Sequence, residues 1–93
     1  MTILTGNQFE APDAAGLSLS ALAWVLADER RAHRFLDLTG LTPEQMRARI
    51  ESPELQLSVL EFLCAHEPDL LAAAESLGVQ PGAIAAAREK LAR

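Results

Sequence analysis

Aromatic and β-branched residues are scarce in this sequence. Among its 93 residues there are three Phe, one Trp and no Tyr, whereas Ala and Leu are the most frequent residue types. Ala and Leu lose little conformational freedom on entering a helix, while β-branched residues lose χ1 freedom. The composition therefore favours helices, and no stretch shows the alternating pattern of a strand. We expect an all-α protein.

The sequence also contains only one cysteine, and it shows neither a leader sequence nor a long apolar run. The single Cys64 cannot form an intramolecular disulfide, so nothing in the sequence points to an oxidising compartment. The first residues lack the basic start and apolar run of a secretory signal. No segment approaches the roughly 18 consecutive apolar residues of a membrane span. These absences predict a cytoplasmic protein with no membrane partner.

Positive charge is in deficit. The sequence has eight Lys and Arg residues and 13 Asp and Glu residues, which gives a formal net charge of −5. An excess of carboxylates repels nucleic acid and anionic membranes, so nucleic acid is an unlikely partner for the chain as a whole.

Pro and Gly residues divide the chain into helices. We expect a flexible N-terminal arm over residues 1–12 and one all-helical domain over 13–93, containing five or six helices. Thr42, Pro43 and Gln45 form the pattern of a capping box, and Ser52 with Pro53 repeats the Pro-started helix. Long apolar helices are predicted over 13–28 and 53–66, and they should form the central pair of a compact bundle.

The two halves of the chain resemble each other at a shift of 38 residues. Residues 17–54 align without a gap on 55–92, which places Gly40 on Gly78 and Pro43 on Pro81. The pattern indicates two tandem three-helix units, each with a helix-turn-helix-like turn.

The segment 71–91 resembles the helix-turn-helix of DNA-binding regulators. A recognition helix offers polar side chains to base edges, but this second helix begins Pro81, Gly82, Ala83 and continues mainly with Ala. We therefore interpret the turn as a packing device.

Basic residues are concentrated in the first unit. They are Arg30, Arg31, Arg34, Arg47 and Arg49, and several of them could share one face. One interpretation is a site for an acidic partner, a phosphate or a nucleic-acid backbone. The other is a solvated face balanced by six interleaved carboxylates, because exposed ion pairs contribute little.

Signs of catalysis are weak. Cys64, His66, Glu67 and Asp69 lie close in sequence, but they lack the spacing of a zinc site or an activated nucleophile. The glycines form no nucleotide-binding loop. We expect no enzyme activity, no cofactor, no bound metal and no small-molecule substrate.

Several runs resemble a small bacterial family of helical proteins, the domain of unknown function 3572. They are ALAWVLAD, RFLDLTGLTPEQMRAR, LEFLCAHEPDLLAAAESLG and the Pro-started last helix, within residues 17–91. The resemblance implies no activity or catalytic residue.

Taken together, the residues predict a non-enzymatic protein-interaction or regulatory module. It would present a helical surface to another protein, or to a second copy in a homodimer. The alternative is nucleic-acid binding through the helix-turn-helix-like turn or the Arg30–Arg49 face.

Overall fold

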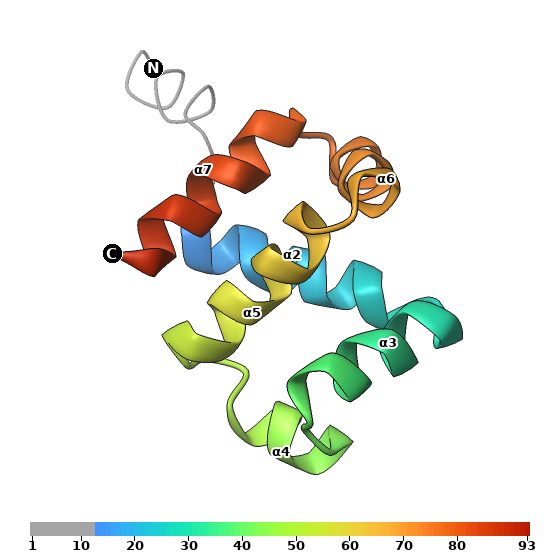
Figure 1. Ribbon diagram of the computed structural model, residues 1–93. Helices are drawn as coiled ribbons and strands as arrows, with labels where there is room; N and C mark the ends of the chain where they lie inside the picture. The colour runs from blue at the N-terminus through green and yellow to red at the C-terminus, as the bar shows by residue number, and fades with distance from the viewer. Residues whose placement is uncertain (1–12) are drawn as a thin grey trace, which may run out of the picture.

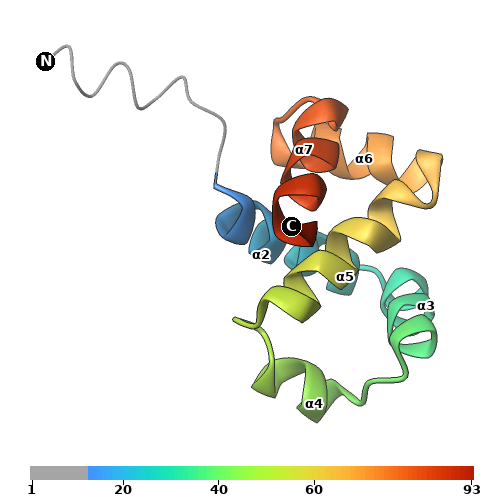
Figure 2. The same ribbon diagram turned by 60° about the vertical axis from the view of Figure 1, so that its left-hand side comes forward.

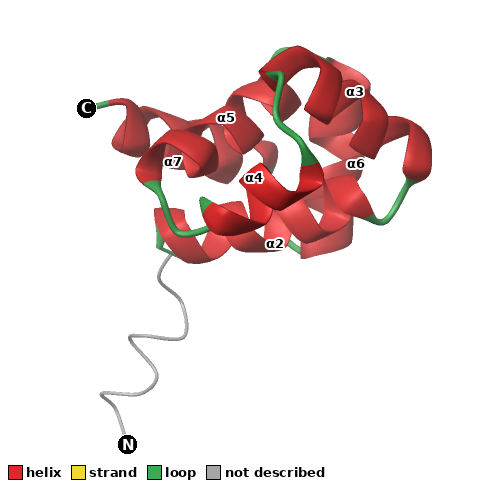
Figure 3. Ribbon diagram, turned by 90° about the horizontal axis from the view of Figure 1, so that it is seen from below, coloured by secondary structure: helices red, strands yellow, loops and turns green. Residues whose placement is uncertain are grey.

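The computed structural model describes residues 13–93, which form an all-α bundle of six helices without a strand (Figures 1 and 3). The predicted fold class is therefore confirmed, and the arm expected over 1–12 lies outside the described residues. The helices are α2 (Ala14–Leu26), α3 (Glu29–Thr39), α4 (Pro43–Ala48), α5 (Pro53–Cys64), α6 (Glu67–Leu77) and α7 (Pro81–Ala92).

The two long helices end two residues earlier than predicted. The helix expected over 13–28 ends at Leu26 because the Asp28 carboxylate accepts hydrogen bonds from the backbone N–H groups of Arg30 and Arg31, at 2.9 and 3.1 Å. An acceptor in this position starts a new helix instead of extending the old one. Likewise α5 ends at Cys64, and His66 is the N-cap of α6.

The predicted Pro-started helices are confirmed. The Thr42 hydroxyl accepts a hydrogen bond from the Gln45 N–H at 3.1 Å, and the Gln45 side chain accepts one from the Thr42 N–H at 3.0 Å. At the start of α5 the Ser52 hydroxyl accepts a hydrogen bond from the Leu55 N–H at 3.1 Å. These contacts satisfy N–H groups that have no partner inside the helix.

The core lies between α2, α5 and α7. Helix α5 packs against both of the others, and α2 also packs against α7. Val25, Leu60 and Ile84, one from each helix, have no exposed surface. The predicted central pair, α2 and α5, thus shares its core with the last helix, while α3–α4 and α6 lie around them (Figures 1 and 2).

The two halves share their junctions and differ in their third helices. Gly40 and Gly78 end α3 and α6 with φ of 73° and 72°, and each is followed by a Pro-started helix. Helix α4 has only six residues, however, whereas α7 has twelve and packs on the core. The internal repeat stays a prediction.

Helices α6 and α7 meet at a bend of 104°, within the range of about 90–120° found in helix-turn-helix pairs. By length and composition only, these two helices together are long and apolar enough for a bent membrane span. No single helix within residues 13–93 is long and apolar enough to cross a bilayer.

The left-handed glycine turn makes a testable prediction. Replacing Gly78 with Ala places a Cβ in open space but in a left-handed backbone conformation, so the cost is conformational, about 1 kcal/mol of folding free energy. Gly82, inside α7, also has open space and no positive φ, so Gly82→Ala should stabilise the fold by about 0.5–1 kcal/mol. Urea unfolding of the two variants should shift the midpoint in opposite directions. A shift of the same sign would contradict this account.

Candidate functional site

The five predicted arginines do not form one surface. Arg30, Arg31 and Arg34 line a shallow depression on α3, and His33 and four carboxylates line it with them: Asp28, Glu29, Asp37 and Asp69. Arg49 lines a different groove, and Arg47 is exposed on α4 and lines neither. The structure therefore brings three of the five together and mixes them with acidic side chains.

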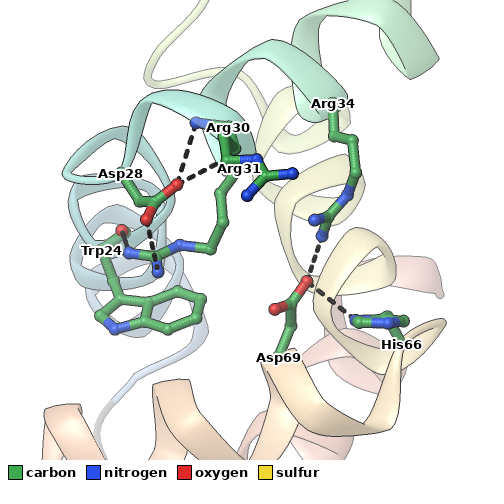
Figure 4. Close-up of polar contacts among 7 residues, drawn as sticks. All are labelled: Trp24, Asp28, Arg30, Arg31, Arg34, His66 and Asp69. Carbon is green, nitrogen blue, oxygen red and sulfur yellow. Dashed lines mark hydrogen bonds and ion pairs between the residues drawn. The ribbon is translucent and has the colours of Figure 1, made fainter.

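Arg31 covers the indole of Trp24 (Figure 4). Its guanidinium carbon lies 3.5 Å from the ring centroid, and one of its terminal nitrogens donates a hydrogen bond to the Trp24 carbonyl at 2.5 Å. The other terminal nitrogen lies 3.7 Å from the Asp28 carboxylate, and the side chain is only 20% exposed. Its buried Nε has no partner among the described residues. Arg31 is thus used inside the chain, where it shields a half-buried aromatic ring.

Arg34 connects the two halves of the molecule. From α3 it donates a hydrogen bond to the carboxylate of Asp69 on α6, and the Nδ1 of His66 lies 3.0 Å from the same oxygen (Figure 4). The Arg34 guanidinium also lies over the Phe62 ring, 5.2 Å from its centroid. This contact could not be predicted from the sequence, because Arg34 and Asp69 are 35 residues apart.

The chain offers a direct test of the Arg31 contact, because Trp24 is its only Trp. Arg31→Ala should move the Trp24 fluorescence emission to longer wavelength and lower the free energy of unfolding by about 1–2 kcal/mol. The matched control Arg30→Ala should leave both nearly unchanged, since the exposed Arg30 side chain has no such contact among the described residues. Equal effects of the two variants would show that the stacking has no special role.

The pKa of Asp28 lies below its usual value of 3.8. The main cause is the hydrogen bond from the Arg31 backbone N–H; desolvation opposes it, and a second backbone hydrogen bond together with the charges of Arg30 and Arg31 lowers the pKa further. These contacts favour the ionised carboxylate at the start of α3.

This depressed pKa predicts a pH-dependent contribution to stability. A carboxyl with a lowered folded pKa stabilises the fold above its unfolded pKa, and the contribution disappears as the pH falls through the folded pKa. Asn also caps helices but does not titrate, so Asp28→Asn should be less stable than the wild type near neutral pH. The difference in melting temperature should shrink between about pH 6 and about pH 2. Asp28→Ser, which also leaves an uncharged N-cap, should show the same pH dependence as Asp28→Asn. A melting-temperature difference from the wild type that does not change with pH would contradict the lowered pKa of Asp28.

Cys64 is half-buried against the core, and burial raises the pKa of its thiol. Among residues 13–93 no three His, Cys, Asp or Glu side chains gather in an arrangement that would hold a metal ion. The expectation that the protein binds no metal or cofactor stays a prediction.

A second surface, which the sequence did not indicate, is an apolar groove between α3 and α5, with a volume of about 630 Å³. We call it the α3–α5 groove. Its floor is formed by Phe35, Leu55 and Phe62, which are at most 8% exposed. The rings of Phe35 and Phe62 meet edge to face, with centroids 5.4 Å apart. Leu38, also in the lining, is 75% exposed, the highest value among the exposed large apolar residues of the described chain.

Helical periodicity explains how the walls of this groove arise. Helix α5 contributes positions 54, 55, 58, 61 and 62, and α3 contributes 35, 38 and 39. These spacings of three and four place each set on one face of its helix. Figure 2 shows that α3 and α5, which contribute these positions, are connected through α4.

Two polar side chains of the groove are already hydrogen-bonded within their own helices. The Ser58 hydroxyl donates to the Glu54 carbonyl at 3.0 Å, and the Thr39 hydroxyl donates to the Phe35 carbonyl at 3.0 Å. An apolar ligand surface can therefore cover them without leaving their donors unsatisfied. Charges enter the lining through Arg49, Glu54 and Glu61.

Residues 13–93 thus form a small all-α bundle whose surface includes an apolar groove and a mixed-charge depression. Residues 11–93 match the family described as "Protein of unknown function (DUF3572)", and the chain belongs to this family. The resemblance seen in the sequence is thereby confirmed. No curated protein and no solved structure matches the chain.

Proposed function

We propose that this protein is a cytoplasmic, non-enzymatic interaction module that binds an amphipathic helix of a protein in the α3–α5 groove. The observation that carries the proposal is Leu38, 75% exposed beside a floor of buried aromatic and aliphatic side chains. A helix lying between two helical walls is a common mode of peptide recognition.

The energetics favour an apolar contact at this place. Covering a fully exposed Leu side chain contributes about 1.5–3 kcal/mol, and aromatic rings on the floor add contact area. The hydroxyls of Thr39 and Ser58 need no new partner, so covering these two hydroxyls carries little desolvation penalty.

The observations do not favour nucleic acid as the ligand. Arg31 and Arg34 are engaged with Trp24 and Asp69, and four carboxylates share the depression that they line. Phosphate binding needs a surplus of positive charge on one surface.

A site-specific crosslink tests the proposal in the cells from which the protein comes. Leu38 is replaced by photoreactive p-benzoylphenylalanine, and the matched control carries the same group in place of Leu71, which is 50% exposed on α6 and lies outside the groove lining. Illumination should produce a discrete protein adduct from position 38, identified by mass spectrometry, and none from position 71. Equal labelling from both positions, or none from position 38, would contradict the proposal.

A further inference from the structure

We propose that the helix received by the α3–α5 groove is α3 of a second copy of this chain, so that the protein forms a two-fold symmetric dimer. The inference rests on the proposed function and names its partner. In such an interface the same patch of both copies meets itself, so the patch must be complementary to itself.

The apolar part of the patch meets this condition. It carries a projection and a depression side by side: Leu38 is 75% exposed, and the adjacent floor contains Phe35, Leu55 and Phe62. A two-fold axis passing beside Leu38 places the Leu38 side chain of each copy over the floor of the other. Each copy then covers the other's most exposed large apolar side chain among the described residues with its own apolar floor.

Two of the three charged residues in the lining, Arg49 and Glu61, meet the same condition. Arg49 lies at the end of the groove where α5 begins, since its carbonyl accepts a hydrogen bond from the Ser52 N–H at 2.8 Å. Glu61 lies seven residues beyond Glu54 along α5, a distance of about 10 Å at 1.5 Å per residue. A two-fold axis across the middle of the groove exchanges its ends, so the end that carries Arg49 and Glu54 in each copy meets the end that carries Glu61 in the other. Arg49 is the cation of the lining that then pairs with Glu61.

These charges are available for such pairing. Within residues 13–93 the ion pairs involve Asp28, Arg31, Arg34, His66 and Asp69, and none involves Arg49 or Glu61. A partner of different sequence would require no particular relation between the two signs. Arg49 at one end of the groove and Glu61 at the other have opposite signs, as a pair exchanged by a two-fold axis requires, while Glu54 adds a second carboxylate at the Arg49 end.

The small number of residues in the α3–α5 groove limits the affinity of the dimer. Twelve residues line the groove, whereas a stable interface of standard size uses about 20–30 residues on each side. The net charge of −5 on each copy also opposes association. We therefore expect a reversible dimer with a dissociation constant of about 10–100 µM.

Sedimentation equilibrium of the full chain tests the dimer. Over concentrations from about 5 µM to about 500 µM, which bracket the expected constant, the wild type should pass from monomer to dimer. Leu38→Asp should weaken the dimer by about tenfold or more, because it places a charge on the apolar floor. The control Leu71→Asp should leave the constant unchanged, and circular dichroism confirms that both variants are folded. Equal weakening by the two variants would overturn the proposal.

A charge exchange tests the two-fold arrangement itself. Arg49→Glu and Glu61→Arg should each weaken the dimer, because each places like charges beside one another. The double variant should recover most of the wild-type affinity, since both pairs are restored with reversed sign. If the loss of dimer affinity in the double variant equals the sum of the losses in the two single variants, the pairing of Arg49 with Glu61 is overturned.

The results also separate this inference from the proposed function. A wild type that remains monomeric over the whole range overturns the dimer. If position 38 still crosslinks to a different protein in cells, the interaction module stands and only its partner changes. If position 38 crosslinks to nothing, both fail.

Discussion

The packing of α5 is the constraint on which the rest of the structure depends. One side of this helix closes the core with α2 and α7, where Leu60 and Leu63 are fully buried. Another side, which includes Leu55 and Phe62, forms the floor of the α3–α5 groove. Because a single helix serves both, the groove has a rigid floor that is fixed by the main hydrophobic core. A surface built in this way is preorganised, and binding it requires little ordering of the protein.

The position of α3 decides whether the groove exists at all. Asp28 ends the preceding helix by capping the next, so the chain turns after only two residues. Arg31 then holds the start of α3 to Trp24, and Arg34 holds its middle to Asp69 and Phe62. These contacts fix α3 along one edge while Leu38, one turn further on, remains exposed. Two of the five arginines predicted as a binding surface, Arg31 and Arg34, therefore hold the helix that forms one wall of the apolar groove.

Contacts between residues that are close in the sequence could be predicted, whereas contacts between distant residues could not. The Thr42–Gln45 capping box depends on residues within one turn, so its prediction succeeded. Gly40 and Gly78, which the sequence placed at the two turns, end their helices with positive φ. The charge environment of Arg34 depends on Asp69, which belongs to another helix and is brought near only by the fold. Equally, the sequence did not show that the short α4 leaves the face of α3 that carries Phe35 and Leu38 open opposite α5.

The charged surface and the apolar surface of α3 differ in the binding free energy that a partner would contribute by covering them. On the charged surface, Arg31 and Arg34 already interact with carboxylates of the same chain. A further exposed ion pair contributes only about 0–1 kcal/mol. On the apolar side Leu38 remains hydrated, and its burial is worth about 1.5–3 kcal/mol. A partner that covers the apolar side gains more than one that competes for arginines already paired with Asp28 and Asp69. This difference, more than the number of basic residues, determines which face of the protein is suited to recognition.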